Sequence, residues 1–263
     1  MREINTKYEI AFDALGCADT PFFCRNLFLE YRASGRKEVI FQNFDFCVAT
    51  PGIHALIGPN GCGKSSLFNL MAGCLGANVS PPSAGNIAYQ IQDVTLSIPG
   101  WLTGLQNLTL VEDGELRNAS IFETRNFIRE KLPFIPSLSE VILNKRAEQM
   151  SGGERQMISL IRTLTRTKRF LLLDEPFSAL DHRRRFQIIP GLRDWVQNNN
   201  RTVIVSMHSI DDAIFLADNV FVSHEPPVNQ FLAIENKRRE ETFNHVLSEE
   251  ANHVRQNIMD ALQ

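Results

Sequence analysis

Eight consecutive residues, Gly58 to Ser65, have the types and spacing of a phosphate-binding loop. They read Gly-Pro-Asn-Gly-Cys-Gly-Lys-Ser and fit the pattern G-x-x-x-x-G-K-[ST]. Glycines are required because peptide N–H groups must turn inward around an anion, which leaves no space for side chains. We expect Lys64 to reach the β- and γ-phosphates of a nucleotide and the Ser65 hydroxyl to bind Mg²⁺. The residues assigned to nucleotide binding in this segment are Gly58, Pro59, Asn60, Gly61, Cys62, Gly63, Lys64, Ser65 and Ser66.

Two neighbouring acids follow an apolar run later in the chain. Phe170–Leu173 has the length of a buried strand and leads directly into Asp174 and Glu175. Such a strand would deliver Asp174 to a metal ion, and Glu175 could act as the general base that orients an attacking water. The simpler interpretation is that Glu175 is a surface acid at a strand end. The position of Glu175 directly after Asp174 argues against that interpretation.

Cys62 lies inside the phosphate loop. The inward N–H groups, the nearby Lys64 and the helix N-terminus all favour a thiolate, so we expect a reactive thiol that bound nucleotide covers. The alternative is a side chain that points away from the nucleotide and reacts slowly. The five cysteines of the chain are odd in number and lack metal-ligand spacing, which predicts free thiols.

The elements that must position these residues alternate between strands and helices. Short apolar runs predict strands at 26–31, 39–48, 53–57, 86–91, 170–173 and 202–205. Apolar residues at helical spacing predict helices after Lys64, over 121–132, and from a capping Ser151 to about Arg166. Strand 53–57 and the helix after Lys64 supply the context that argues against a chance match of the loop. Short buried strands alternating with helices indicate a parallel α/β core.

Composition and charge exclude several classes of protein. The chain has 27 basic and 30 acidic side chains, and its net charge of −3 argues against a dedicated nucleic-acid binder. No apolar run approaches the ~18 residues that span a bilayer, and the first twenty residues show no leader pattern. We therefore expect a soluble, non-secreted protein.

A third motif, Met150-Ser151-Gly152-Gly153-Glu154-Arg155-Gln156, lies between the first two. Here the chain resembles the ATP-binding-cassette (ABC) ATPases, whose signature usually reads L-S-G-G-Q. Met150 and Glu154 depart from that pattern, while the Ser-Gly-Gly core is intact. The resemblance rests on the order and spacing of six elements, which are Walker A at Lys64, the Q-loop at Gln92, the signature at Ser151, Walker B at Asp174, the D-loop Ser178-Ala179-Leu180-Asp181 and a switch histidine, His208.

The resemblance implies an α/β fold, a P-loop NTPase (RecA-like) core with a parallel sheet, a small antiparallel β-region and an inserted helical subdomain. We expect an N-terminal extension at 1–25, the nucleotide-binding domain at 26–224 with its helical subdomain at about 94–166, and a C-terminal helical extension at 225–263. In that extension, apolar residues at helical spacing from Phe243 to Leu262 predict packing on the chain's own body. A self-association surface is the alternative.

The resemblance also implies a role for each motif residue. Glu175, His208, Gln92 and Lys64 are the expected catalytic residues, and Ser65, Gln92 and Asp174 the expected Mg²⁺ ligands. Two cassettes would pair head to tail, so that Ser151, Gly152, Gly153 and Asp181 contact the ATP of the partner. Tyr31 would stack on the adenine, with Phe28 as the second choice; either could instead be a core aromatic residue.

The segment Asp174-Glu175-Pro176-Phe177-Ser178-Ala179-Leu180-Asp181 resembles the ATPase subunits of bacterial solute importers. This implies a subunit that binds ATP and Mg²⁺, pairs with a second ABC ATPase subunit as a homodimer, and powers transport through a separate membrane permease. It would be cytoplasmic and peripheral on the inner face of the cell membrane. A permease helix would dock near Trp101, unless Trp101 is a buried anchor of its own domain. An exporter or lipid-transport ATPase, and a soluble ABC ATPase in cofactor assembly, are the alternatives.

Overall fold

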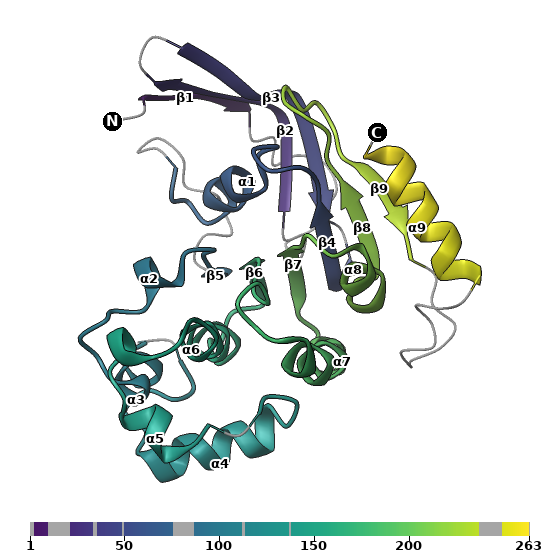
Figure 1. Cartoon of the computed structure of the whole chain (residues 1–263). Coiled ribbons are helices and arrows are strands. Elements are labelled where there is room, and N and C mark those ends of the chain that lie inside the picture. The colour runs from purple at the N-terminus through teal and green to yellow at the C-terminus, as the bar shows by residue number, and fades with distance from the viewer. Residues whose placement is uncertain are drawn as a thin grey trace.

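Two β-sheets lie on either side of helix α1 in the computed structural model of the chain (Figure 1). The structure describes residues 3–9, 22–33, 36–48, 50–75, 87–111, 114–136, 138–236 and 249–262. The smaller sheet is antiparallel, in the order β1 (Glu3–Glu9), β2 (Phe22–Ala33) and β3 (Arg36–Val48). Strands β2 and β3 are longer than the strands predicted at 26–31 and 39–48.

The larger sheet has the strand order β5-β6-β7-β4-β8-β9. Its strands are β4 (Gly52–Ile57), β5 (Ile87–Gln90), β6 (Phe170–Asp174), β7 (Thr202–Ser206), β8 (Asn219–Val222) and β9 (Leu232–Glu235). All neighbours pair in parallel except β8 and β9, which are antiparallel. The fully buried residues of β4, β6 and β7 show that this sheet is covered on both faces, as parallel sheets are.

Different helices cover the two faces of the larger sheet. Helix α1 (Lys64–Met71) packs its Leu67 and Phe68 between the two sheets. On the opposite face, the core contains residues of α6 (Gly152–Leu164), α7 (His182–Asn198) and α8 (Ile210–Leu216). The loop after β8 joins the two sheets, because Val228 exchanges backbone hydrogen bonds with β3 at Ile40 and Gln42.

A helical lobe occupies the chain between β5 and β6 (Figure 1). It contains α2 (Val94–Ser97), α3 (Gly104–Thr109), α4 (Ile121–Lys131), α5 (Glu140–Asn144), the 3-10 helix Ala147–Gln149 and α6. Serine or threonine side chains cap α3, α4, α5 and α6 by accepting a backbone N–H of the first turn. The predicted helices at 121–132 and after Ser151 are confirmed.

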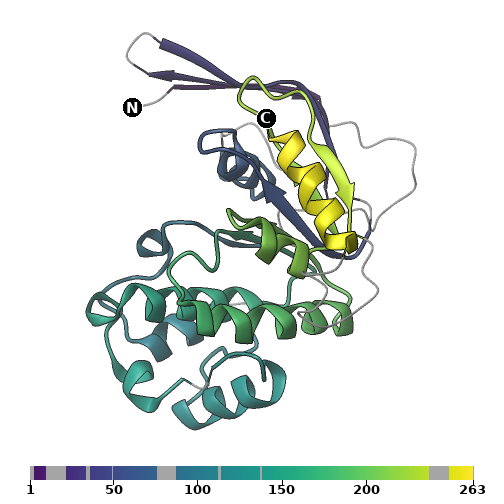
Figure 2. The same cartoon turned by 45° about the vertical axis from the view of Figure 1, so that its right-hand side comes forward.

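The C-terminal part of the described chain adds a strand and a helix to the core. Strand β9 was not predicted, and helix α9 (Glu249–Ala261) lies along it (Figure 2). Ala251 and Ile258 of α9 are fully buried, which confirms packing on the chain's own body; Phe243 lies outside the described residues. Arg255 of α9 also donates two hydrogen bonds to Asp211 of α8, at 2.9 and 2.6 Å. None of the helices in the described part combines the length and apolar character needed to cross a bilayer.

The lobe and helix α7 approach each other very closely at Gly191. A Cβ atom on Gly191 would lie 2.0 Å from Cβ and 2.6 Å from Cγ of Phe134. Phe134 is a buried residue between α4 and α5. The two segments are therefore at a separation that only glycine permits.

We predict that Gly191→Ala destabilises the fold. Overpacking of this contact should cost about 3 kcal/mol, the upper end of the usual range, because the clash is with Cβ of Phe134. Alanine gains roughly 1 kcal/mol over glycine in a helix, so the free energy of unfolding should fall by about 2 kcal/mol. Urea unfolding measures the difference. Gln187→Ala, at an exposed position of the same helix, is the control and should stay within about 0.5 kcal/mol of wild type. Equal stability of the Gly191→Ala variant and wild type would contradict the contact.

Candidate functional site

The phosphate loop connects the end of β4 to the first residue of α1, as its sequence predicted. Its backbone is tightly constrained at Gly63, where φ is 100° and a Cβ atom would lie 2.6 Å from Cγ2 of Ile40 and 2.8 Å from Cζ of Phe41. Only glycine meets both conditions. The loop therefore presents the N-terminus of α1, with its unpaired N–H groups and positive dipole end, as a site for an anion.

Lys64 lies inside this turn. Its side chain is buried, and its ammonium group donates hydrogen bonds to the carbonyl oxygens of Gly58 at 2.8 Å and Pro59 at 3.0 Å. The positive charge is thereby held within the loop before any anion binds. This agrees with the predicted role of Lys64 opposite a phosphate group, a role that stays a proposal.

Cys62 is placed differently from our first expectation. Its side chain is 1 % exposed, and its Sγ atom lies 3.7 Å from Nζ of Lys64. A Cβ atom on Gly58 would lie 2.8 Å from that sulfur, so the thiol packs against the loop from the interior. The expectation of an accessible, reactive thiol is therefore wrong, because the Cys62 side chain is buried beneath the loop, against Gly58 and Lys64.

Asp174 is a buried carboxylate at the end of β6. Its exposed fraction is 1 %, and its register partner on β7 is Ser206, which donates a hydrogen bond to Oδ1 at 2.5 Å. Burial raises the pKa of Asp174, while hydrogen bonds from Ser206 and Ser65 and the charge of Lys64 lower it. Tyr89 of β5 also donates to Oδ2, at 3.5 Å. The pKa of Tyr89 is raised by burial and by Asp174, so it remains a protonated donor.

Ser65 and Asp174 are thus brought together from two elements, although they are 109 residues apart in sequence. A hydroxyl and a carboxylate are oxygen ligands of the kind that Mg²⁺ prefers, and Mg²⁺ takes its other ligands from phosphate and water. Among the described residues, no group of three or more His, Cys, Asp and Glu could hold a metal ion by itself. The pair therefore fits Mg²⁺ bound jointly with a nucleotide.

Glu175 has an unusual backbone. Its φ is 49°, in the left-handed region, where a side-chain-bearing residue is strained by on the order of 1–3 kcal/mol. Its N–H donates to Oγ of Ser206 at 2.9 Å. Its carbonyl oxygen accepts from Nε2 of Gln156 at 3.2 Å and from the hydroxyl of Ser178 at 3.0 Å. Its carboxylate lies 2.6 Å from Nε2 of His208. Base and switch histidine, predicted separately, are therefore in direct contact.

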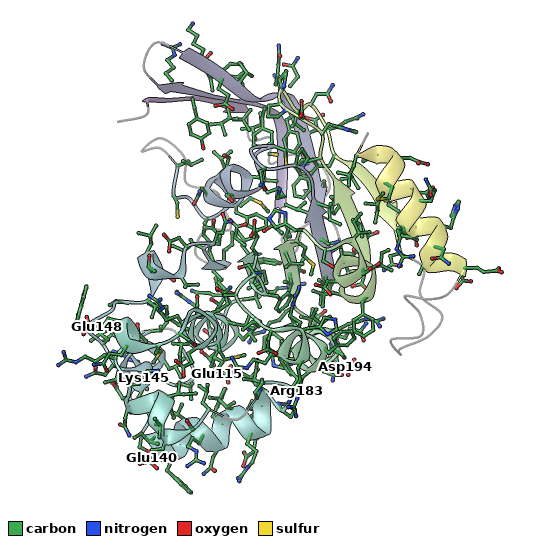
Figure 3. All side chains as sticks on the ribbon, in the orientation of Figure 1. Glu115, Glu140, Lys145, Glu148, Arg183 and Asp194 are labelled. Carbon is green, nitrogen blue, oxygen red and sulfur yellow. The ribbon has the colours of Figure 1, made fainter. Side chains whose placement is uncertain are left out.

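The signature motif begins helix α6 with a capping box. The hydroxyl of Ser151 accepts the N–H of Glu154 at 3.2 Å, and the Glu154 carboxylate accepts the N–H of Ser151 at 2.7 Å. Lys145, labelled on the lobe in Figure 3, donates to the same carboxylate at 2.9 Å. The hydrogen bonds from Lys145 and Ser151 lower the pKa of Glu154. Lys145 thus balances the negative charge that Glu154 introduces where the signature usually has an uncharged glutamine.

Other predicted site residues lie apart from this cluster. Within the described chain, no hydrogen bond or ion pair joins Ser151 to the phosphate loop, and none joins Gln92, exposed just after β5, to Asp174. Asp181 caps α7 by accepting the N–H of Arg184 at 2.9 Å. Trp101 is 72 % exposed, so its interpretation as a buried anchor is wrong.

Tyr31 lies close to the start of α1. Its phenol donates a hydrogen bond to Oγ of Ser66 at 2.9 Å, and its half-buried ring packs on the cluster around α1. This position beside the phosphate loop is compatible with contact to the base of a nucleotide. The choice of Tyr31 over Phe28 stays a prediction.

The comparison with known families settles the class of protein. The sequence model of the family described as "ABC transporter" matches residues 41–178, more than half of the chain. The chain belongs to this family. It is an ATP-binding cassette, and the fold class, the family and the ATPase class that the sequence predicted are confirmed.

Similar proteins include ATP-binding subunits of importers. The taurine import ATP-binding protein TauB of Pseudomonas aeruginosa is 32 % identical over 215 residues, 76 % of this chain and 77 % of TauB. The nitrate transport protein NasD of Klebsiella oxytoca is 29 % identical over 246 residues, 88 % of this chain and 91 % of NasD. The nitrate import ATP-binding protein NrtC of Synechocystis sp. is 28 % identical over 229 residues, 80 % of this chain but 33 % of NrtC. The cassette thus spans about a third of NrtC.

A solved structure described as the dimeric structure of MJ0796, a bacterial ABC transporter cassette, is similar in fold. Its TM-score is 0.67 at 21 % identity, over 82 % of this chain and 99 % of that one. A second structure of the same protein, described as a post-hydrolysis state bound to ADP and Pi, has a TM-score of 0.67 at 20 % identity, with the same coverage. At this level of identity the likeness supports the fold.

Three residues of the cluster escaped the sequence analysis, namely Tyr89, Gln156 and Ser206. A signal existed for Ser206: β6 and β7 are each four apolar or β-branched residues followed by one polar residue, Asp174 and Ser206 respectively. Pairing them in parallel and in register places those two polar residues side by side. For Gln156 and Tyr89 no comparable pattern is present.

We predict that maleimide reaction with the native cassette spares Cys62. Cys74 is exposed and should be modified, whereas Cys62 is only 1 % exposed and should be protected. Peptide mass mapping after brief labelling with N-ethylmaleimide, with and without urea, measures the order of reaction. Cys62 should react at least about tenfold more slowly than Cys74 until the protein unfolds, because only the accessible thiolate is a nucleophile. Equal rates in the native protein would show that the loop opens readily.

Proposed function

We propose that this cassette hydrolyses ATP with Mg²⁺ in a head-to-tail pair of subunits and thereby powers solute import through a separate membrane permease. The observation that carries the proposal is the meeting of Lys64, Ser65 and Asp174 with the Glu175–His208 pair at one edge of the parallel sheet. Ligands of α/β sheets bind at this edge, outside the carboxyl ends of the strands.

In this proposal each residue of the cluster has one task. Ser65 and Asp174 hold Mg²⁺, which when bound neutralises phosphate charge. The Glu175 carboxylate accepts a proton from the attacking water, and Lys64 balances charge on the β- and γ-phosphates. His208, half exposed beside Glu175, donates to the γ-phosphate once nucleotide is present and leaves the carboxylate to the water. Gln92 would complete the Mg²⁺ site when its exposed loop closes.

A second cassette explains the position of the signature. Ser151 and Gly152 are exposed at the N-terminus of α6, whose backbone N–H groups and positive dipole end suit a phosphate. Since no hydrogen bond or ion pair joins Ser151 to the phosphate loop in the described part of its own chain, we assign Ser151, Gly152 and Gly153 to the ATP of the partner subunit. The D-loop residue Asp181 is assigned to the same interface.

Coupling to a membrane permease is supported by the exposed apolar side chains that follow Gln92. Leu96 is 78 % and Trp101 72 % exposed, and both lie between the Q-loop and α3. The similar proteins are named for taurine, nitrate and bicarbonate transport. We therefore assign this surface to a permease at the inner face of the cell membrane, and import as the direction.

We predict that Glu175→Gln binds ATP but hydrolyses it roughly 100- to 10,000-fold more slowly than wild type, because the amide keeps the size of the carboxylate and cannot act as a base. The trapped nucleotide should hold two chains together, which size-exclusion chromatography with and without ATP–Mg²⁺ detects. Lys64→Ala is the control and should neither hydrolyse ATP nor dimerise with it. A Glu175→Gln variant that stays monomeric with bound ATP would contradict the head-to-tail arrangement.

A second prediction concerns Trp101. Tagged cassette should recover a multispanning membrane protein from detergent-solubilised membranes of its source cells, and Trp101→Ala should reduce the recovery about tenfold, as loss of an aromatic interface anchor does. Phe122→Ala is the control, because Phe122 is 74 % exposed on α4 and should leave recovery unchanged. Mass spectrometry identifies the recovered protein. If wild-type cassette hydrolyses ATP but recovers no membrane protein, the cofactor-assembly alternative is favoured.

A further inference from the structure

The backbone of Glu175 is held in a conformation that glutamate rarely adopts. In the described part of the chain, the other non-glycine residues with positive φ are all asparagines, Asn26, Asn43, Asn118 and Asn200. Asparagine tolerates the left-handed region, whereas glutamate has no such tendency. The surroundings of Glu175 must therefore impose its φ of 49°.

Ser206 makes two contacts that can impose this conformation. Its Oγ accepts the N–H of Glu175 at 2.9 Å, and its proton is donated to Oδ1 of Asp174 at 2.5 Å. A hydroxyl has one donor and two acceptor positions, so both hydrogen bonds coexist. Ser206 is fully buried, so water cannot replace either bond.

The position of the hydroxyl is fixed by the sheet. Ser206 and Asp174 are register partners at the ends of the parallel strands β7 and β6. The carbonyl oxygen of Glu175 has several donors, from Gln156 and Ser178, whereas its N–H is paired with Ser206. Ser206 is therefore the contact whose loss leaves the partly buried N–H of Glu175 without its partner.

We propose that Ser206 is a positioning residue for ATP hydrolysis, whose hydroxyl holds the left-handed backbone of Glu175 and so aims the Glu175 carboxylate at the attacking water. This inference rests on the proposed function. It acts through Glu175, since the single proton of the Ser206 hydroxyl is donated to Asp174, its oxygen accepts the Glu175 N–H, and the side chain is fully buried. Misplacement of a catalytic group by roughly 1 Å can lower a rate about a hundredfold.

The test is steady-state ATPase kinetics of Ser206→Ala. We expect kcat to fall at least about tenfold with the KM for ATP within about twofold of wild type, the pattern of an interaction used in the transition state. Ser206→Thr keeps the hydroxyl and should recover kcat to within about threefold of wild type. Thr202→Val removes a buried hydroxyl at the other end of β7 and should change kcat less than about twofold.

A double-mutant cycle separates positioning from general stability. In the Glu175→Gln background, adding Ser206→Ala should lower the residual rate of ATP hydrolysis by less than about twofold. The reason is that Ser206 acts by placing the Glu175 carboxylate, which this background lacks. An equal loss in both backgrounds, or a kcat of Ser206→Ala within about twofold of wild type, would overturn the inference. If Ser206→Ala does not fold, Ser206→Cys, which keeps the size and weakens the hydrogen bonds, is judged by the same criteria.

Failure of this inference is distinguishable from failure of the proposed function. Wild type is measured first against Lys64→Ala. No hydrolysis by wild type above the Lys64→Ala level would refute the ATPase activity of this site, on which the inference depends. Hydrolysis by wild type together with an unimpaired Ser206→Ala variant would overturn the role of Ser206 alone.

Discussion

The burial of the Asp174 carboxylate constrains the positions of the strands and the helix around it, because they must supply its hydrogen-bond and charge partners. An ionised group with 1 % exposure is costly unless it is paired and hydrogen-bonded. Its partners are the hydroxyls of Ser206, Ser65 and Tyr89 and the charge of Lys64, and they come from β7, β5 and the first turn of α1. The strands β4, β5, β6 and β7 must therefore keep their register for these partners to reach one carboxylate.

Strand β7 has a central place in this arrangement. It lies between β4, which leads into the phosphate loop, and β6, which ends at Asp174. Ser206 ends the strand and His208 follows two residues later, so the same strand supports the buried hydroxyl and the exposed imidazole. Helix α1 and the smaller sheet cover one face of these strands, while α6 and α7 cover the other. The site consequently stands on the most buried elements of the molecule.

Features with a local signal could be predicted from the sequence, and those set by tertiary packing could not. The phosphate loop, the acid after an apolar strand and the Ser151 cap each follow from neighbouring residues, and each is present as expected. The inward Cys62 and the exposed Trp101 depend on what packs around them, which spacing does not encode. The role of Ser206 depends on the register between β6 and β7, whose partners Asp174 and Ser206 are 32 residues apart in sequence. The left-handed backbone of Glu175 depends on the same register and on the hydrogen bond from its N–H to Ser206.

The contact between Gly191 and Phe134 has a mechanical consequence. The backbone of Gly191 already touches the side chain of Phe134, so the lobe cannot move closer to α7 at this point, because packed interiors resist compression. A rotation of the lobe about this contact would not compress it. The contact therefore sets the closest approach between the core and the lobe, which carries Trp101 on one loop and Ser151 at the start of α6. A force on the lobe surface would meet its stiffest resistance along the line from Phe134 to Gly191.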